Sequence, residues 1–506
     1  MANLADMERE AGNFASELFA RGFIISDAIP VHPSGWSETA FGGWRIAHHP
    51  RVAVQQSSTG SGSRILCLGI IFDTRAVSTT QSEYLDLLAR ALARSEDEML
   101  AELSHSNGRY ILLYCTAEGH SYLLTDATGM RCALFCSVAH RTIASHLELV
   151  ALDAGIASRE NDRQSKFGFP GRQTPFRGVY LLTPNTKLNL ATMKPERYWP
   201  MTALPRMELA AAANLVAERL EKAYHWITSN FDAFVTITAG LDSRVTLSIA
   251  KTDGRYATYY RNDEADTDKI DRDTTLAMAA RFGLDHTLLG PETREAIPKD
   301  YLKVLKFNTY RPHLPRMTYA YKQHMIRDPD RIVHIRSNLS EIGRMFYKRV
   351  GSNPLTSEDL LKLWSREPRL RSDGNRRLFE EYAETTDFFS APVEKTSLFY
   401  WEHRMGCWHS QVTTESDIVC ESLSLYNNRH LLSAMLSVEP DLQKRSILLK
   451  KIIIDRWPEL ADFPVNGKPF APPKAYARLL VAPSPLQARL VRHLAVWIGA
   501  ARSRRA

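Results

Sequence analysis

Short apolar runs separated by turns dominate the first 200 residues of this chain. Residues 64–72 form a continuous apolar run of the kind found in buried strands. Two further runs, 108–115 and 121–126, flank Glu118-Gly119 and predict a hairpin. Similar patterns predict strands at 131–138 and 142–145, helices within 80–104, and a second hairpin over 179–188. The first half is therefore expected to be rich in β-structure.

The spacing of apolar residues changes after residue 206. From Leu209 to Ile227 they recur at helical intervals. Strand-like runs follow at 234–238, 256–260, 286–289 and 331–335, with helix-like segments between them, and the pattern beyond residue 355 is mainly helical. This alternation predicts a parallel sheet with helices on both faces. The polar stretch 151–175, which contains several glycines and prolines, is expected to be a loop or linker.

The junction after strand 234–238 carries the clearest chemical signal. A small-residue turn leads directly into Leu241, Asp242 and Ser243, where a helix is expected to begin. A helix N-terminus favours a bound phosphate, and Gly240 lets the backbone approach it closely. Asp242 would repel that phosphate unless a cation lay between them, which suggests Mg²⁺. The alternative is an ordinary strand-to-helix turn with Asp242 as the helix N-cap.

A second polar loop, residues 337–344, follows the strand expected at 331–335. Ligands of an open parallel sheet bind beyond the carboxyl ends of the strands, so both loops are expected to face one crevice. Asp242 and Glu341 would then share a Mg²⁺ ion, with phosphate oxygens and waters as its other ligands. Alternatively, Glu341 is a surface carboxylate at a helix start, where the helix dipole favours it.

The hexapeptide from Thr238 to Ser243 resembles the pyrophosphate-loop signature SGGxDS of the asparagine synthetase superfamily, which includes β-lactam synthetases and lasso-peptide cyclases. Other segments resemble that family in their order along most of the chain: 108–114, 123–129, 182–185, 197–199, 271–286 and 337–343. The last of these resembles a shortened SGxGxDE loop, in which the Asp-Glu pair is reduced to Ser340-Glu341.

The resemblance implies an α/β protein of two domains. Residues 1–200 would form an Ntn-hydrolase-like αββα sandwich, and residues 201–506 an adenine-nucleotide α-hydrolase-like (PP-loop) synthetase domain with a parallel sheet and a helical C-terminal part. ATP and Mg²⁺ would be its cofactors, with Asp242 and Glu341 as metal ligands. The implied nucleotide-binding residues are Thr238, Ala239, Gly240, Leu241, Asp242, Ser243, Arg244, Tyr259 and Ser337. The implied catalytic residues are Lys468, Asp242 and Glu341.

The chain departs from the family pattern at several of these positions. Thr238 and Ala239 replace a serine and a glycine, and Arg244, where a small residue is common, is expected to add a phosphate contact. Lys468, in the loop 463–470, resembles the lysine that stabilises the developing negative charge of adenylation and amide formation. The alternative for Lys468 is a solvated loop lysine. Lys450 and Lys451 fall where the family places a pyrophosphate contact.

The chain also departs from the family pattern at its N-terminus, where the family's glutaminases carry the residue that releases ammonia from glutamine. Glutaminases of the family use a cysteine that becomes the first residue once Met is removed, with its own amine as the base. Here Ala2 follows Met1, and the first cysteine is Cys67. We therefore expect no glutamine hydrolysis by this chain, and a structural or partner-binding role for its first domain.

Composition narrows the class of protein. A chain of 506 residues, 44% hydrophobic and 24% charged, is ordinary for a soluble globular protein. It contains no membrane-spanning apolar run of ~18 residues and no secretory signal, so a cytoplasmic location is expected. Cys67, Cys115, Cys132 and Cys136 are expected to be core thiols rather than metal ligands. The net charge of +7 is scattered, so no nucleic-acid partner is expected.

These features predict an ATP-dependent, AMP-forming amide synthetase that acts on a small-molecule or peptide carboxylate and an amine. The amine would come from free ammonia, a second substrate, or the same molecule in a cyclisation. The alternative is a catalytically reduced relative that serves as a binding or scaffold subunit among the partner proteins of a biosynthetic pathway.

Two further segments are open to more than one interpretation. The aromatic cluster at 400–409 suits a packed helix interface better than substrate recognition, and the basic amphipathic helix near residues 486–505 is expected to dock on the protein, with partner or membrane-surface contact as the alternative.

Overall fold

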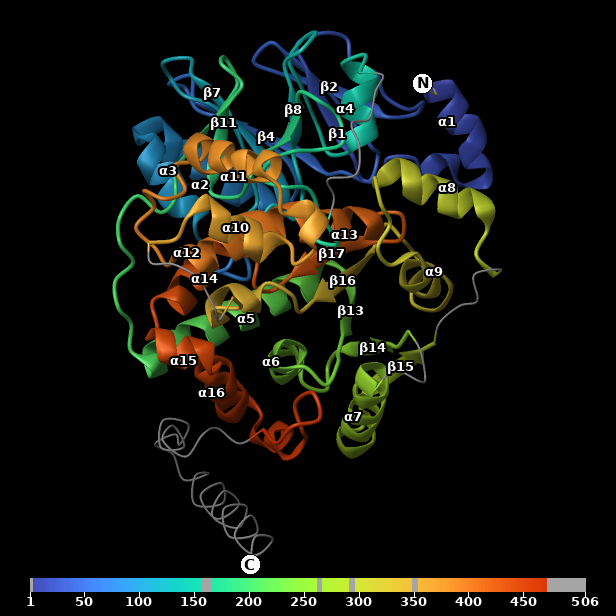
Figure 1. The fold of residues 1–506 in the computed structure, drawn as a ribbon, viewed down its shortest axis with the longest axis vertical. Helices are drawn as coiled ribbons and strands as arrows, with labels where there is room; N and C mark the ends of the chain where they lie inside the picture. The colour runs from blue at the N-terminus through green and yellow to red at the C-terminus, as the bar shows by residue number, and fades with distance from the viewer. Residues whose placement is uncertain (1–2, 157–164, 262–265, 291–295, 348–353, 471–506) are drawn as a thin grey trace, which may run out of the picture.

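The computed structural model describes residues 3–156, 165–261, 266–290, 296–347 and 354–470. The strands of this part of the chain form three sheets, two antiparallel and one parallel (Figure 1). The predicted mixture of antiparallel and parallel sheets with helices is confirmed. None of the described helices is both long and apolar enough to cross a membrane. The helix expected near residues 486–505 lies outside the described residues.

The two antiparallel sheets are built from the first 200 residues and have six strands each. The first has the order β10-β8-β9-β1-β3-β2 and the second β12-β11-β7-β6-β5-β4. The strands of the first sheet are β1 (Phe23–Ser26), β2 (Ser37–Phe41), β3 (Trp44–His48), β8 (Leu134–Cys136), β9 (Thr142–Ala144) and β10 (Val179–Leu181). Those of the second are β4 (Val54–Ser58), β5 (Arg64–Asp73), β6 (Ser106–Cys115), β7 (Ser121–Thr125), β11 (Thr186–Asn189) and β12 (Lys194–Arg197).

Alternation along the strands places these two sheets face to face. Phe23 and Ile25 of β1 share one core with Leu66 and Leu68 of β5. The intervening residues of β5 point the other way, onto α2 (Gln81–Arg94) and α3 (Glu96–Leu103). The outer face of the first sheet packs against α4 (Leu147–Asp153) and residues of α1 (Leu4–Ala11). All six cysteines are buried and unpaired, as expected of core thiols.

The third sheet is entirely parallel, with the order β15-β14-β13-β16-β17. Its strands are β13 (Asp232–Thr236), β14 (Arg255–Tyr259), β15 (Asp285–Leu289), β16 (Ile332–Arg336) and β17 (Glu421–Ser424). The strand order runs outward in both directions from the neighbouring pair β13 and β16. This pair is therefore the topological switch point, where ligands of such sheets bind.

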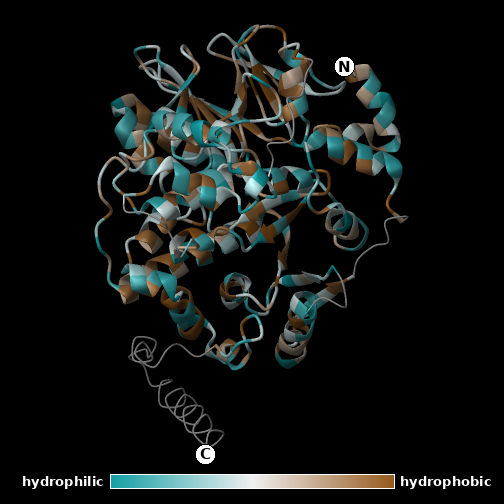
Figure 2. Ribbon diagram, in the orientation of Figure 1, coloured by the Kyte–Doolittle hydropathy of each residue, from teal (hydrophilic) through white to brown (hydrophobic). Residues whose placement is uncertain are grey.

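Helices cover both faces of the parallel sheet, and apolar residues of its central strands pack against them (Figure 2). Val235 and Ile335 pack with α5 (Leu209–Asn230), α6 (Leu241–Ala250) and α16 (Ile447–Arg456). On the opposite face, Phe234 and Ala257 pack with α8 (Lys299–Asn308) and α9 (Pro315–His324). The remaining α-helices are α7 (Asp266–Phe282), α10 (Ser357–Trp364), α11 (Asp373–Thr385), α12 (Lys395–Phe399), α13 (Ser410–Ser416), α14 (Arg429–Leu436) and α15 (Pro440–Lys444).

Two details differ from the sequence-based expectations. Residues 179–188 do not form a hairpin: β10 pairs with β8 in one sheet, whereas β11 pairs with β7 and β12 in the other. The chain crosses between the sheets at Pro184-Asn185, where Asn185 has a φ of 67°. Strand β17 was also missed, because Glu421-Ser422-Leu423-Ser424 has a single apolar residue and its strand pairing depends on β16.

A buried ion network joins the antiparallel sheets to the parallel one. Arg109 of β6 contacts Asp417 through its two terminal nitrogens, Nη1 and Nη2. Its Nη1 also lies 2.7 Å from Oε1 of Glu421, the first residue of β17. Arg131 reaches the other oxygen of Glu421 at 2.7 Å. All four side chains are buried. The two arginines hold the pKa of Glu421 to about 2 against the effect of burial, which alone would raise it.

Replacing Arg109 by Leu is expected to lower the free energy of unfolding by about 3–5 kcal/mol, because Asp417 would lose its buried partner and Glu421 one of its two. Urea unfolding of the two proteins measures this loss. Arg94→Leu is the control, since Arg94 makes an exposed ion pair with Glu98 that is worth less than about 1 kcal/mol. Equal effects of the two substitutions would contradict the role given to the network.

Buried neutral histidines are expected to make the fold sensitive to acid. Burial lowers the pKa of His146 and of His403 to about 3. Below pH ~6.5 the unfolded chain protonates these rings while the folded chain does not, so this stability is present above ~6.5 and is lost as the pH falls. We expect a loss of about 1 kcal/mol per histidine between pH ~7 and ~5.5, measured by urea unfolding. His403→Gln should make the pH dependence shallower, and an unchanged slope would contradict this assignment.

Candidate functional site

The loops that follow β13 and β16 meet at the switch point of the parallel sheet. Asp242 lies in the first turn of α6, and Glu341 lies in the short helix η3 (Ser340–Arg344) that follows β16. The hydroxyl of Ser340 donates a hydrogen bond to Asp242, and Arg344 Nη1 is 3.2 Å from Asp242 Oδ1. The structure thus brings together the two acidic residues singled out from the sequence, with an arginine and a hydroxyl that the sequence did not identify.

The electrostatics of this acidic pair are unusual. Burial and the neighbouring charge of Asp242 raise the pKa of Glu341 to about 7. Burial disfavours the charge of Arg344, but the two carboxylates outweigh it and raise the pKa of that guanidinium. Glu341 Oε2 also accepts the N–H of Leu339 at 3.0 Å, and Leu339 itself has a φ of 90°, a left-handed conformation that is costly for a leucine. Two close carboxylates of this kind are stabilised in their charged forms by a cation.

The loop from Thr238 to Ser243 is held by its own hydrogen bonds. Thr238 N–H donates to Ser243 Oγ at 3.0 Å, Gly240 N–H to Thr238 Oγ1 at 3.1 Å, and Ala239 N–H to Asp271 Oδ1 at 2.8 Å. A Cβ on Gly240 would lie 3.0 Å from Thr238 Oγ1, so a larger residue would press on the hydroxyl that accepts the Gly240 N–H. The first turn of α6 has no acceptors for its N–H groups within the helix, so these groups are the ones that can face an anion.

A tight turn carries Lys468 to this loop. Val465 and Lys468 exchange backbone hydrogen bonds of 2.7 and 3.0 Å around Asn466-Gly467, whose φ angles of 48° and 75° fit a type I′ turn. Asn466 N–H donates to Ala239 O at 3.0 Å, so the turn is fastened to the loop itself. Figure 1 shows this segment between α6 and α7. Lys468 is exposed there, two residues from the contact with the loop.

Arg244 lies differently from the phosphate contact expected of it. Its side chain is buried, and its guanidinium donates to Phe463 O and Pro464 O, both at 2.7 Å, and to Ala239 O at 3.4 Å. Burial lowers its pKa to about 10. In this structure Arg244 therefore ties the segment that carries Lys468 to the loop, a role that only long-range contacts determine.

The remaining predicted residues take different positions. Ser337 follows β16 directly, and its hydroxyl is buried without a hydrogen-bond partner among the described residues. The same holds for the hydroxyl of Tyr426, whose pKa is raised by burial and by the charge of Asp242. Tyr259 ends β14, beside β13, and its ring packs edge-on against Tyr321 with centroids 6.3 Å apart. Lys451 pairs with Asp455 at 2.9 Å, and Lys450 Nζ lies 5.7 Å from the ring centre of Phe470.

The carboxylate and hydroxyl donors at this site suit a hard cation such as Mg²⁺, which binds oxygen. Ser337 and Tyr426 add two buried hydroxyls that have no hydrogen-bond partner among the described residues. In the described part of the chain, no group of three or more His, Cys, Asp or Glu side chains is arranged to hold a metal. The residues that reasoning from sequence missed are Ser340, Arg344, Tyr426, Asp271 and Asn466. Of these, only Asn466 had a usable signal, the Asn-Gly pair typical of tight turns.

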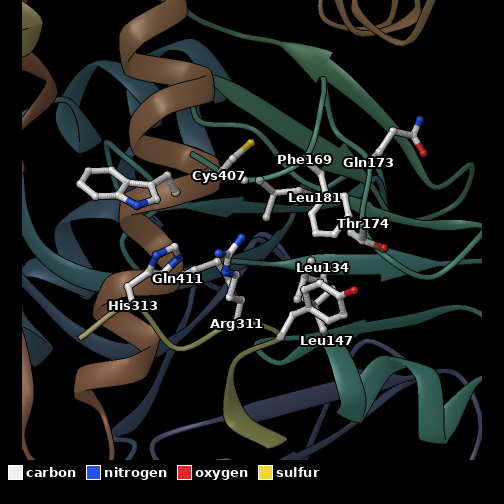
Figure 3. A pocket seen from close by; sticks show the side chains of 13 residues that line it. Leu134, Leu147, Phe169, Gln173, Thr174, Leu181, Arg311, His313, Cys407 and Gln411 are labelled. Atoms are coloured by element: carbon white, nitrogen blue, oxygen red, sulfur yellow. The ribbon is translucent and has the colours of Figure 1, made fainter. Parts of the chain in front are cut away.

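A separate small cavity of about 40 Å³ contains none of these residues (Figure 3). It is lined by Leu134, Phe169, His313, Cys407 and Gln411, among others. Leu134 belongs to the first antiparallel sheet, whereas Cys407 and Gln411 belong to η5 (Tyr400–His409) and α13. This cavity therefore marks the seam between the two halves and not the switch point.

No protein-family model matches the chain, and no curated protein matches it either. Among solved structures, it is similar to the glutamine phosphoribosylpyrophosphate (PRPP) amidotransferase from B. subtilis complexed with ADP and GMP. That similarity has 12% identity, covers 67% of this chain and 74% of that chain, and has a TM-score of 0.23. A second structure, described as the allosteric regulatory enzyme of purine biosynthesis, matches with 11% identity over 66% of this chain and 74% of that one, at a TM-score of 0.24. Similarity at this level carries no argument about the fold or function of this chain.

Replacing Arg244 by Met is expected to loosen residues 458–470, because three main-chain carbonyls lose their buried donor. Hydrogen–deuterium exchange should then show faster exchange in this segment, with unchanged protection in β5 and β6. Arg90→Met, which alters an exposed arginine of α2, is the matched control. Unchanged protection of residues 458–470 in Arg244→Met would contradict the role given to Arg244.

Proposed function

We propose that this protein is a Mg²⁺-ATP-dependent, AMP-forming amide synthetase. A substrate carboxylate would attack the α-phosphate of ATP to give an acyl-adenylate and pyrophosphate, and an amine would then displace AMP from the acyl carbon. The observation that carries the proposal is the convergence of Asp242 and Glu341 at the switch point, beside a helix N-terminus. The resemblance of residues 238–243 to the pyrophosphate loop of the asparagine synthetase superfamily adds to it.

The residues of the site suggest distinct roles in this reaction. The first turn of α6 and the Ser243 hydroxyl would bind phosphate oxygens. Asp242 and Glu341 would hold the magnesium ion, which would neutralise charge on the triphosphate and stabilise the pyrophosphate leaving group. Arg344, now paired with Asp242, is close enough to exchange that partner for a phosphate. Lys468 would stabilise the charge that develops during adenylation and amide formation.

The N-terminal half supports the proposed lack of glutaminase activity. Strand β1 begins only at Phe23, after α1 and the short helix η1 (Gly12–Glu17). The residues between η1 and β1 are Leu18, Phe19, Ala20, Arg21 and Gly22, which offer no hydroxyl or thiol nucleophile. Ala2, on which the sequence argument rested, lies outside the described residues. The amine would accordingly come from solution or from a substrate.

One observation favours the alternative of a catalytically reduced binding or scaffold subunit. The N–H groups of Thr238, Ala239 and Gly240 already have protein acceptors, so the loop offers an anion fewer donors than its sequence suggests. ATP binding separates the two proposals, because a scaffold that has lost its nucleotide site would not bind Mg²⁺-ATP.

Asp242→Asn is expected to weaken Mg²⁺-ATP binding at least tenfold, because it removes one of two metal-binding carboxylates. Isothermal titration calorimetry of the full chain with Mg²⁺-ATP measures the change in affinity. Asp253→Asn makes the same chemical substitution in the exposed turn after α6 and should leave the affinity unchanged. Absence of binding by the unaltered protein, or equal binding by Asp242→Asn, would contradict the proposal.

A further inference from the structure

A large cavity opens beside the residues that follow η3. Its volume is about 1230 Å³, enough for a substrate well beyond the size of an amino acid. Phe346 and Tyr347, which line it, directly follow η3, the helix that carries Glu341. Part of the cavity wall therefore follows the proposed metal-binding loop directly along the chain.

Aromatic contacts make the same connection in space. The ring of Tyr400 lies 4.7 Å from that of Phe346 and 5.6 Å from that of Tyr347, measured between centroids. Tyr400 also packs in one hydrophobic core with Leu339 and Ile342, which lie close to Glu341 along the chain. Phe346, which lines the cavity, is thus linked through Tyr400 to the loop of Glu341, where acyl transfer is proposed.

Arg404 stands out among the residues of this cavity. It is only 9% exposed, and its Nε has no hydrogen-bond partner among the described residues. Its guanidinium lies over the ring of Phe167, 3.1 Å from the centroid, and 5.0 Å from that of Trp408. Its side chain makes a hydrogen bond with Tyr347, and no carboxylate of the described residues lies within ion-pair distance of it. A buried cation without a carboxylate is costly unless an anion completes it.

The backbone around Arg404 is also unusual. Residues 400–409 form a π-helix, η5, instead of continuing as the α-helix that precedes and follows them. The predicted packed interface is confirmed for most of this segment: Trp401 is buried and donates to Ala127 O at 2.7 Å, and His403 is buried against Phe399. π-Helical turns are rare and are often found at functional sites. Here the π-helix carries both Tyr400 and Arg404.

The rest of the cavity wall is positively charged. Its basic residues are Lys166, Lys362, Arg366, Arg371 and Arg404, against the acidic residues Asp359 and Glu367. Both acidic side chains are engaged elsewhere: Asp359 accepts the N–H and hydroxyl of Thr356 at the start of α10, and Glu367 pairs with Arg369 at 3.0 Å. Lys362 is likewise paired, with Glu358 at 3.4 Å, so the excess positive charge comes from Lys166, Arg366, Arg371 and Arg404 and favours an anion.

We propose that this cavity binds the acyl substrate, and that the substrate carries, besides the reacting carboxylate, a second anionic group held by Arg404 and a flat apolar or aromatic body held by Phe167 and Phe346. The assignment of this ligand as the acyl substrate rests on the proposed synthetase function. The anion site itself stands on the burial, stacking and lack of a carboxylate partner of Arg404. A substrate of this class would bridge about one turn of η5, from Arg404 to the neighbourhood of Tyr400 and Glu341.

Two fluorescent probes of nearly the same shape test the anion site. Anilinonaphthalene sulfonate is a flat aromatic anion, and phenylnaphthylamine is its uncharged counterpart. We expect the full chain to bind the sulfonate at least tenfold more tightly than the amine. Arg404→Gln should weaken sulfonate binding at least tenfold and amine binding less than twofold. Arg404→Lys should restore part of the preference, and Arg90→Gln, which alters an exposed arginine of α2 outside the cavity, should have no effect.

Each other outcome overturns the anion site. These outcomes are no binding of the sulfonate, no preference over the amine, or an equal loss of both probes in Arg404→Gln. Thermal unfolding of the variants shows whether Arg404→Gln is folded, and Arg404→Lys keeps the test decisive if it is not. Titration with Mg²⁺-ATP separates this proposal from the synthetase proposal. If the sulfonate results hold but no Mg²⁺-ATP binds, the anion site stands and its assignment to an acyl substrate falls.

Discussion

The contact between Arg109, Arg131 and the acidic residues Asp417 and Glu421 holds this molecule together. It lies where β6 of the antiparallel sheets meets the edge strand of the parallel sheet. Neighbouring amides reinforce it: Asn427 donates to Gly108 O at 2.7 Å, and Asn428 to Ser106 O at 2.9 Å. Because both arginines and both carboxylates are buried, none can lose its partner without leaving a charge in a low-dielectric interior.

This constraint extends to the site. β17 pairs in parallel with β16 along its whole length, and the loop after β16 carries Ser337 and Glu341. Ser424, which ends β17, donates its hydroxyl to Asn338 O at 3.0 Å. The position of Glu341 relative to Asp242 therefore depends on how the antiparallel sheets anchor β17. The antiparallel sheets thereby fix the edge of the parallel sheet that carries the candidate site.

The other half of the site is fixed by a different device. The Asn466-Gly467 turn and the buried guanidinium of Arg244 fasten a distant segment to the loop after β13. Both contacts are made to main-chain carbonyls, so they position Lys468 without occupying the groups that could meet a substrate. The π-helix η5 places Arg404 in the wall of the large cavity and Tyr400 against Phe346 of that wall. Phosphate, metal and acyl functions would thus each be held by elements with unusual backbone conformations that contacts between distant segments keep in place.

The sequence by itself determined most of the elements and the identity of the acidic pair. Continuous apolar runs predicted β5 and β6 as buried strands. The strand, loop and helix at 234–250 could be predicted because an apolar run, a small-residue turn and a helix-like segment follow one another there. Tertiary structure alone decided which strands pair. Residues 179–188 were predicted to form a hairpin but divide between two sheets, because strand propensity does not determine which strand a segment pairs with. Tertiary contacts also decided that Glu421-Ser422-Leu423-Ser424 is a strand. They decided as well that the Arg244 guanidinium donates to main-chain carbonyls, and that Arg344 pairs with Asp242. Each of these depends on contacts between residues far apart in the chain, whose energies arise only when burial removes water from both partners at once.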